Sequence, residues 1–331
     1  MSEVETELTQ LNLVGAVRLA LKQEMERDPD VVVLGEDVGI DGGVFRATEG
    51  LIKEFGENRV IDTPLSESGI VGVAIGLALY GLKPVAEIQF EGFLYPALDQ
   101  IISHVGRIRN RSRGRFHVPL VVRFPYGGGI RAPEHHSDSP EALLVHTPGI
   151  KVVTPSTPYD AKGLLASAIR DPDPVLFMEP KRIYRAIVED VPEDDYTVPL
   201  GEAKVVREGT DVTLVSWGAM VRYSNEAAET VKDRISIEVI DLRTLSPMDT
   251  ATITKSVEKT GRAVVVHEAP RTAGLGAEVT AIINESAFLS LEAPVERVAG
   301  FDVPFPQHKL ENYYLPNTER IVKAIEKVAN F

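Results

Sequence analysis

The chain has 331 residues, of which 44% are hydrophobic and 25% charged, the proportions of a globular protein long enough for two domains. Its 35 lysines and arginines against 49 aspartates and glutamates give a formal charge of -14, which argues against non-specific binding to nucleic acid. There is no cysteine, so disulfides, thiolate catalysis and zinc-thiolate sites are excluded.

The sequence gives no sign of a membrane segment or an export signal. No apolar run reaches the roughly 18 residues that a membrane span requires. The N-terminus also lacks a basic region followed by an apolar core. We therefore expect a cytoplasmic protein without membrane contact.

The N-terminal segment predicts a helix followed by a buried strand. The helix is expected from Thr9, with Leu13, Val17 and Leu21 on one face, and it should stop at Asp28-Pro29. The apolar run 31–34 is typical of a buried parallel strand. The turn 35–39 then lies at the carboxyl end of this strand, where open α/β sheets tend to place ligands.

The stretch 62–81 predicts a strand end and then a long helix that carries no charge beyond its first turn. Ser66 can cap this helix, Glu67 lies in its first turn and Gly81 ends it. Three glycines are three and four residues apart and so share one face: Gly69, Gly72 and Gly76. Each costs about 1 kcal/mol against alanine, so we expect another backbone or a flat ligand against this face. Spacing alone leaves open whether Glu67 is functional or merely favoured by the helix dipole.

The rest of the chain continues the alternation of strands and helices. Strands are predicted at 84–90, 120–123, 152–153 and 174–178, with helices at 95–109 and 158–170. The acidic, proline-bearing stretch 189–195 is typical of a linker. Beyond it we expect strands at 212–215, 237–240 and 263–266 and a terminal helix at 321–329. The pattern predicts an α/β protein of two doubly wound units with mainly parallel sheets.

The loop from Tyr126 to Ser139 is rich in glycine and contains the adjacent residues His135 and His136. An imidazole that faces a cavity can move protons near neutral pH. Metal binding is a second interpretation, although no further ligand at helical spacing lies nearby. A solvated surface loop is a third.

Two aromatic residues, Phe90 and Phe93, follow a predicted strand and should lie near the carboxyl edge of the sheet, where a ring can stack on a flat heterocycle or fill the core. No phosphate-binding motif accompanies them. The chain has no Walker-type loop, no dinucleotide glycine fingerprint, and no Gly-Asp-Gly segment followed by an asparagine that could hold magnesium and a diphosphate. A complete site for a phosphate-bearing cofactor is therefore not encoded.

Several motifs, in order and over essentially the whole length, resemble one family. They are LGEDV at 34–38, GGVFR at 42–46, DTPLSE at 62–67, EIQF at 87–90, HS at 136–137 before SPE at 139–141, PGIKVV at 148–153, EPK at 179–181 and DLRT at 241–244. The chain resembles the β subunit of heterotetrameric thiamine-dependent 2-oxo-acid dehydrogenases, the decarboxylating component of the pyruvate and branched-chain complexes.

The resemblance implies a domain organisation and a set of site residues. Residues 1–190 would form the pyrimidine-binding domain, 191–204 a linker and 205–331 a transketolase-like C-terminal domain. Glu67 matches the glutamate that hydrogen-bonds the aminopyrimidine of thiamine diphosphate. Phe93 matches the aromatic residue that packs against this ring, and Leu65 would line the same pocket. His136 matches the active-site histidine of the family.

The resemblance also implies an activity and partners. The expected reaction is the oxidative decarboxylation of a 2-oxo acid, with transfer of the acyl group to a lipoyl domain. The α subunit of an α2β2 heterotetramer would hold Mg2+ and the diphosphate, so this chain would be active only with its α subunit. A dihydrolipoyl acyltransferase core would be the further partner.

Two other interpretations stay open at this point. One is a fragment of a transketolase-like thiamine enzyme, which shares both domains. The other is a non-catalytic docking subunit, against which the presence of both Glu67 and His136 speaks. The substrate is also open, because 179–181 and 96–100 favour branched-chain members while 91–95 is similar to bacterial pyruvate enzymes.

Overall fold

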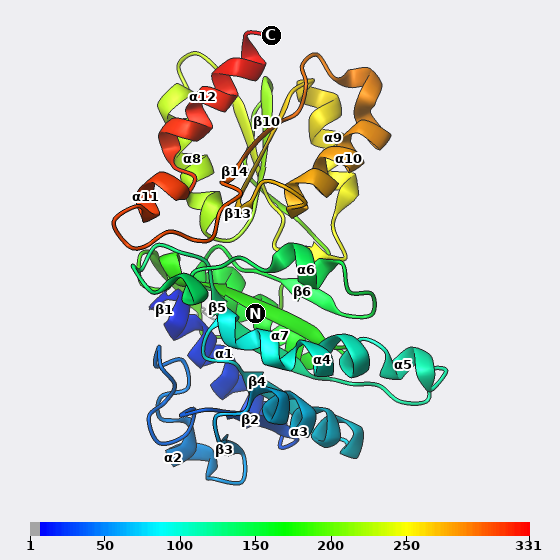
Figure 1. The fold of residues 1–331 in the computed structure, drawn as a ribbon. Coiled ribbons are helices and arrows are strands. Elements are labelled where there is room, and N and C mark those ends of the chain that lie inside the picture. Colours follow the sequence, from blue (N-terminus) through cyan, green and yellow to red (C-terminus); the bar gives the residue numbers. More distant parts are fainter. Residues whose placement is uncertain (1–6) are drawn as a thin grey trace, which may run out of the picture. The chain divides into compact units, whose positions relative to one another are not determined.

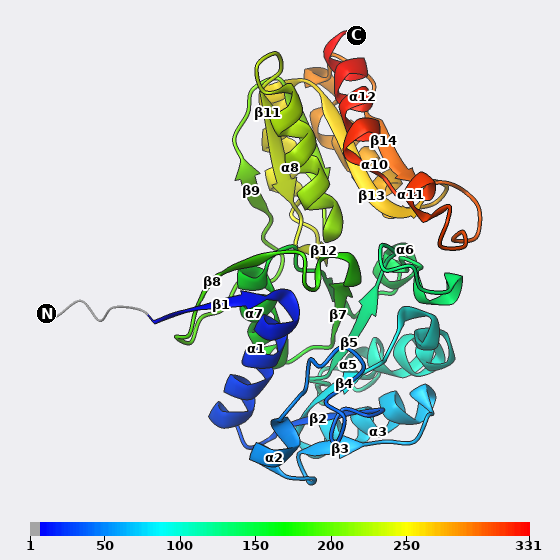
Figure 2. The same cartoon turned by 90° about the vertical axis from the view of Figure 1, so that its left-hand side faces the viewer.

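The computed structural model describes residues 7–331, which divide into two compact units (Figures 1 and 2). The first unit comprises the residues up to Pro125 together with Thr147–Glu179 and Ile183–Leu200. The second comprises Tyr126–His146, Pro180–Arg182 and Gly201–Phe331. Each unit is an α/β structure built on one main sheet, in agreement with the predicted fold class. The predicted domain boundaries stay a prediction.

The sheet of the first unit has the strand order β6-β7-β5-β4-β2-β3. Strand β2 pairs in parallel with both β3 and β4, β4 pairs in parallel with β5, and β6 with β7. The elements up to β5 are β1 Leu8–Asn12, α1 Leu13–Arg27, β2 Val31–Gly35, α2 Leu51–Phe55, β3 Val60–Asp62, α3 Glu67–Tyr80, β4 Lys83–Glu87, η1 Glu91–Ala97, α4 Leu98–Gln100, η2 Ile101–Val105, α5 Ile108–Arg111 and β5 Val121–Tyr126. They are followed by β6 Lys151–Val153, α7 Pro158–Arg170, β7 Val175–Pro180 and β8 Val188–Pro192.

The first helix begins later than predicted, at Leu13 rather than Thr9. Residues Leu8–Asn12 form β1, which pairs antiparallel with β8. The Asn12 side chain accepts a hydrogen bond from the backbone N–H of Gly15 at 2.9 Å and so caps the helix. The apolar residues of the helix have the predicted spacing. The residues before the cap, however, pair with β8 and form a strand instead of the first helical turn.

The acidic stretch 189–195 is not a simple linker, so that interpretation was wrong for most of it. Its first half belongs to β8, which is tied to β1. Beyond the strand, the Asp195 carboxylate pairs with the guanidinium of Arg170 at the end of α7. This acidic stretch, which was predicted to be a linker, is therefore bound to its unit by strand pairing and by an ion pair.

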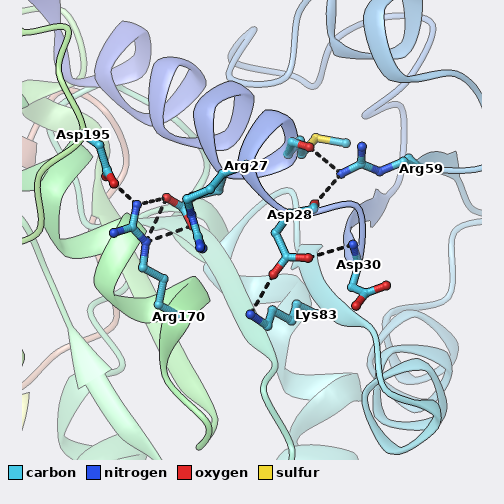
Figure 3. Close-up of polar contacts among 9 residues, drawn as sticks. Arg27, Asp28, Asp30, Arg59, Lys83, Arg170 and Asp195 are labelled. Carbon is cyan, nitrogen blue, oxygen red and sulfur yellow. Dashed lines mark hydrogen bonds and ion pairs between the residues drawn. The ribbon is translucent and has the colours of Figure 1, made fainter.

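A network of charged groups joins the C-terminal part of α1 to neighbouring segments of the same unit (Figure 3). The carboxylate of Glu24, which is only 1% exposed, accepts hydrogen bonds from Arg27 and from Arg170 of α7. At the end of the helix, the guanidinium of Arg59 donates to the carbonyl oxygens of Met25 at 2.8 Å and Asp28 at 2.9 Å. Cations at a helix C-terminus satisfy free carbonyls and suit the dipole. This network holds α1 against α7 and against the start of β3.

Helix α3 has the predicted start and end. It begins at Glu67 after the N-cap residue Ser66, although the Ser66 side chain makes no capping hydrogen bond, and it ends at Gly81 with φ of 108°. No other backbone lies against its glycine face: a Cβ at Gly76 would meet nothing within 4 Å, one at Gly72 only the Gln100 side chain at 3.7 Å, and one at Gly69 only the Ser66 side chain. Tyr80, at the same end, is 88% exposed. The expected backbone or ligand against this face is thus not supplied by residues 7–331.

The helix predicted over 95–109 is present only in pieces, η1, α4, η2 and α5. Pro96 lies inside η1 and cannot donate a backbone hydrogen bond, which prevents a regular α-helical turn. The middle piece, η2, has π-helical geometry. The helical spacing was read correctly, but the backbone interruptions were not.

The sheet of the second unit has the order β14-β13-β10-β11-β9. Its neighbouring strands pair in parallel, except that β9 is antiparallel to β11. Helices α8 and α12 cover one face and α9 and α10 the other (Figure 1), so this unit is doubly wound. Its elements are η3 Glu134–His136, α6 Glu141–Val145, η4 Lys181–Ile183, β9 Lys204–Arg207, β10 Val212–Ser216, α8 Ala219–Val231, β11 Ile237–Asp241, β12 Thr244–Ser246, α9 Thr250–Thr260, β13 Ala263–Pro270, α10 Leu275–Ala287, η5 Phe288–Ser290, β14 Glu296–Gly300, α11 Glu311–Tyr314 and α12 Thr318–Ala329.

The strands predicted at 212–215, 237–240 and 263–266 correspond to β10, β11 and β13, and the terminal helix to α12. Strands β10, β11 and most of β13 are fully buried, as expected for parallel strands covered on both faces. In the described part of the chain no helix is long and apolar enough to cross a membrane.

Candidate active site

Three parallel strands of the first unit end at one edge of its sheet. Gly35 of β2 lies opposite Asp62 of β3 and Glu87 of β4, so the loops after these strands leave from the same side. The strand order also reverses here, because the chain passes from β2 to β3 on one side and then to β4 on the other. Open α/β sheets bind ligands at such a point. The loops after β3 and β4 carry the predicted site residues of this unit.

Glu67 is the first residue of α3 and is half-buried. The positive end of the helix dipole favours a carboxylate there. Within residues 7–331 its side chain makes no hydrogen bond and no ion pair. Burial, and then the charges of Asp37 and Glu67, raise the pKa of the nearby Glu36. The edge therefore holds two acidic side chains that influence each other, and the carboxyl group of Glu67 is available to a group from outside.

The segment that packs against α3 carries one end of a wall of aromatic rings. Phe93, in η1, meets Phe90 edge to face, with ring centroids 6.1 Å apart, and Phe45 continues the wall at 5.5 Å from Phe90. Segment η1 packs against α3, and the Ser68 hydroxyl of α3 donates a hydrogen bond to the Pro96 carbonyl of η1. The structure therefore brings the segments of Glu67 and Phe93 together.

Leu65 precedes the cap of α3 and is 67% exposed. A large apolar side chain that is exposed beside an available carboxyl group can line an apolar pocket once a ligand or a partner covers it. Leu65 and Glu67 share one loop, and Phe93 belongs to the segment packed against it. The three predicted residues of the first unit thus lie on neighbouring segments, and their joint role stays a prediction.

Behind the aromatic wall lies a buried cluster of ionisable groups. The Arg123 guanidinium donates to Glu179 from Nε at 2.6 Å and from Nη2 at 2.8 Å, and it also donates to Glu87. The Tyr184 hydroxyl donates to Glu179 at 2.6 Å, and its ring meets Phe45 at 5.1 Å. The cluster thus connects the core of the sheet to the aromatic wall.

Electrostatics in this cluster favour a charged Arg123, whereas burial disfavours a charged Glu87. Burial raises the pKa of Glu87, although the charge of Arg123 acts against this. For Arg123, burial acts to lower the pKa, but Glu179 and Glu87 together hold it above its usual value. Burial and the charge of Glu179 also raise the pKa of Tyr184 well above its usual value. One buried guanidinium therefore holds two buried carboxyl groups.

The second unit contains the other predicted site residue, His136, at the end of η3. Its side chain is half-buried and its backbone carbonyl accepts a hydrogen bond from Lys181. Burial, and then the neighbouring His135, lower the pKa of His136, so its imidazole is neutral at neutral pH. The ring of His135 lies 4.1 Å from that of His136. A neutral imidazole on a glycine-rich loop can accept or pass on a proton.

Two buried carboxyl groups lie near the base of this loop in the same unit. Glu141 opens α6, and burial raises its pKa to about 8, with a further contribution from Glu268. Burial raises the pKa of Glu268 to about 7, while Arg182 and Lys181 act in the opposite direction. In the part of the chain that the structure describes, neither oxygen of Glu141 has a hydrogen-bond partner. Both groups are therefore poised to be protonated near neutral pH.

The raised pKa of Glu141 predicts a pH-dependent stability. A carboxyl group with a pKa of about 8 when folded and 4.5 when unfolded stabilises the fold fully below pH 4.5 and loses this contribution as the pH rises to 8. The Glu141→Gln variant should therefore gain stability over the wild type, by up to about 1.4 kcal/mol per pH unit across this range.

Trp217, the only tryptophan, is buried in the second unit and reports its unfolding by fluorescence. Urea unfolding of both forms at pH 5, 6.5 and 8, followed at Trp217, measures the difference. The exposed Glu285 on α10 provides a matched control, and Glu285→Gln should show no such slope. Parallel pH profiles for Glu141→Gln and the wild type would contradict the prediction.

Sequence reasoning assigned no role to Arg123, Glu87, Glu179 and Glu311. A charged residue inside an apolar strand, as in 120–124, is the signal that could have identified Arg123. No local signal identifies Glu311, because its partner Gly129 is 182 residues away in sequence. Within residues 7–331 no group of three or more His, Asp or Glu side chains is arranged to hold a metal ion.

The chain was compared with known proteins. Family models of the transketolase pyrimidine-binding domain and the transketolase C-terminal domain match residues 9–186 and 201–321. A pyruvate dehydrogenase E1 component subunit β of Bacillus subtilis is 55% identical over 325 residues, which cover 98% of this chain and 100% of that protein. The protein of the same name in Acholeplasma laidlawii is 54% identical over 320 residues, or 96% and 98% of the two chains.

One solved structure has the same fold. It is described as a split gene transketolase, an inactive β4 tetramer, and it superposes with a TM-score of 0.79 over 97% of this chain and 98% of its own. The two sequences are 24% identical. This likeness confirms the fold of both domains.

Proposed function

Since the chain belongs to the family of pyruvate dehydrogenase E1 component β subunits, we propose that it is the β subunit of a thiamine-diphosphate-dependent enzyme that oxidatively decarboxylates pyruvate. The observation that carries this proposal is the carboxyl group of Glu67. It is half-buried at the carboxyl edge of a parallel sheet, has no polar partner in its own described chain, and opens α3, the helix against which the segment of Phe93 packs.

The residues at this edge fit the aminopyrimidine half of thiamine diphosphate. A flat, nitrogen-bearing ring needs an acid for its ring nitrogen, an aromatic face and an apolar lining. Glu67 would supply the acid, Phe93 the aromatic contact and Leu65 the lining. When bound, the cofactor would supply the carbon nucleophile and the electron sink for decarboxylation.

The task of Glu67 is to hold a proton at the ring nitrogen. Its position at the start of α3 favours the carboxylate, whereas closure of the site around it would disfavour the charged form. The second acid, Glu36, has a pKa that burial and the charges of Asp37 and Glu67 raise, so a proton at this edge is favoured. These opposing influences suit the role proposed for Glu67, which must both donate a proton to the ring nitrogen and take it back.

The task of His136 is to assist the transfer of the acyl group to a lipoyl domain. In the overall reaction the carboxylate of the 2-oxo acid leaves as CO2 and the acyl group forms a bond to one sulfur of the lipoyl disulfide. The other sulfur takes up a proton and becomes a thiol, so the disulfide is reduced. A neutral imidazole that can be protonated is suited to deliver this proton.

A partner α subunit would complete the site. We assign to it the Mg2+ and the diphosphate half of the cofactor, in an α2β2 heterotetramer whose further partner is a dihydrolipoyl acyltransferase core. The open space at Gly76 of α3 supports the need for a partner, because an interior glycine without a neighbour costs stability and leaves room for a close backbone. The proposed domains are 1–190 and 205–331, and the proposed location is the cytoplasm.

Turnover by the co-purified α and β subunits tests the proposal. With thiamine diphosphate and Mg2+, the complex should decarboxylate pyruvate with a higher kcat/KM than 3-methyl-2-oxobutanoate, and the β chain alone should be inactive. Activity is measured with an artificial oxidant. A preference for the branched-chain acid would contradict the assignment of pyruvate, and turnover by the β chain alone would contradict the shared site.

A further inference from the structure

The loop that carries His136 is held by a side chain from the far end of the sequence. Glu311, the first residue of α11, is only 3% exposed. One oxygen of its carboxylate accepts a hydrogen bond from the backbone N–H of Gly129, and the other accepts from the backbone N–H of Arg131 at 3.1 Å. A single carboxylate thus binds two amides of the loop through charge-assisted hydrogen bonds, which are the stronger kind.

These two amides lie where the loop backbone is least regular. Gly129 has a φ of 99° and Arg131 a φ of 60°, both in the left-handed region. For a residue with a side chain, such as Arg131, this conformation is unfavourable and persists only where surrounding contacts hold it. The hydrogen bond from Arg131 to Glu311 is such a contact. Without it the loop would have other conformations available between Gly129 and η3.

The loop is also packed closely from both sides at this point. A Cβ at Gly128 would clash with the Phe305 ring and would lie 3.2 Å from the Glu311 carboxylate. A Cβ at Gly129 would clash with the side chain of Arg182, whose guanidinium lies over the Tyr223 ring at 4.2 Å. Only glycines fit here.

The far end of the loop is tied down as well. The Gly127 amide donates to the Asp138 carbonyl at 2.9 Å, and Lys181 donates to the His136 carbonyl. The Ser137 hydroxyl donates to the Pro133 carbonyl at 3.1 Å. The segment between these ties, 129–131, is held by Glu311. Glu311 therefore holds the part of the loop that leads into η3 and His136.

We propose that Glu311 is a positioning residue that fixes the loop from Gly127 to His136 and thereby sets the imidazole of His136 for acyl transfer to the lipoyl domain. This inference rests on the role proposed above for His136. It predicts that a change at Glu311 slows lipoyl acylation, the step that needs His136. Pyruvate decarboxylation, which depends on the first unit, should keep its rate. A loss of overall stability would affect both.

The test uses the complex with the co-expressed α subunit and compares Glu311→Ala, Glu311→Gln and His136→Ala. A glutamine can accept one of the two backbone hydrogen bonds but not both, so its effect should lie between the wild type and Glu311→Ala. For Glu311→Ala we expect the rate of acylation of a free lipoyl domain to fall about 10- to 100-fold, because misplacing a reacting group by about 1 Å can cost 100-fold. Pyruvate decarboxylation measured with an artificial oxidant, and the KM for pyruvate, should change less than threefold. The exposed Glu319 on α12 is the matched control, and Glu319→Gln should change none of these rates.

Hydrogen exchange supplies a readout that is independent of activity. The amides of Gly129 and Arg131 should exchange faster in Glu311→Ala, while those of β10 and α8 should be unchanged. Unaltered exchange in the loop, or faster exchange with unaltered lipoyl acylation while His136→Ala impairs it, would overturn the positioning role. If His136→Ala itself acylates the lipoyl domain like the wild type, the proposed role of His136 fails, and the positioning role fails with it. The exchange data show in that case whether Glu311 still holds the loop.

Discussion

Replacing Glu67 by glutamine should abolish cofactor-dependent decarboxylation while leaving the fold intact. The amide cannot hold the proton that the carboxyl group would place at the ring nitrogen, and acid-base groups in such positions contribute about 10²- to 10⁴-fold to a rate. We therefore expect kcat of the α–β complex, measured with an artificial oxidant, to fall at least about 100-fold. Binding of the cofactor, measured by titration, should weaken much less, because the substitution leaves the contact proposed for Phe93 and the diphosphate site proposed for the α subunit unchanged.

The structure explains why the fold should survive this change. The Glu67 side chain makes no hydrogen bond or ion pair within residues 7–331, so nothing is left unpaired when its charge is removed. The exposed Glu57 in the same unit offers a matched control, and Glu57→Gln should retain full activity and an unchanged unfolding curve. Full activity of Glu67→Gln in the reconstituted complex would refute the proposed role.

Local sequence signals indicated the candidate site residues, but not the long-range contacts that hold their segments in place. Glu67 could be placed at a helix start after a strand because proline, cap and acid occur within four residues, and these are local signals. Its neighbourhood with Phe93 depends on the parallel pairing of β2 with β3 and β4, which alternating elements suggest but do not specify. The hydrogen bonds between Glu311 and the loop of His136 join residues about 180 positions apart in sequence. No local sequence pattern predicts such a contact.

The same distinction holds for the fold. The α/β class followed from the alternation of strand and helix patterns, and helix α7 has the predicted bounds because Thr157 caps it before Pro158. The errors fell where a distant segment decided the local structure. Thr9 lies in a strand only because 188–192 pairs with it, and the acidic stretch 189–195 is a strand edge and an ion-pair partner for the same reason.

The Arg123→Met variant should lose about 3–5 kcal/mol of stability, the largest effect on folding that we expect from one substitution. Removal of the guanidinium leaves Glu87 and Glu179, both buried, without the cation that they share. Burial already raises the pKa of Glu87, so without Arg123 its ionised form becomes still less favourable in the folded state. A carboxyl group whose pKa is raised in the folded state destabilises the fold as the pH rises and the group ionises. The stability difference between the wild type and Arg123→Met should therefore be larger at pH 8 than at pH 6.

Arg109→Met is the matched control, because Arg109 also pairs with a carboxylate, Asp173, but is 51% exposed. Such surface pairs contribute at most about 1 kcal/mol. Urea unfolding by far-UV circular dichroism measures the loss in the first unit, and Trp217 fluorescence shows whether the second unit unfolds separately. Adding Glu87→Gln to Arg123→Met should restore part of the lost stability, because the added amide removes one buried charge rather than a contact. If Arg123→Met loses no more than Arg109→Met, the cluster behind the aromatic wall is not a buried ion network, and the aromatic wall does not depend on it.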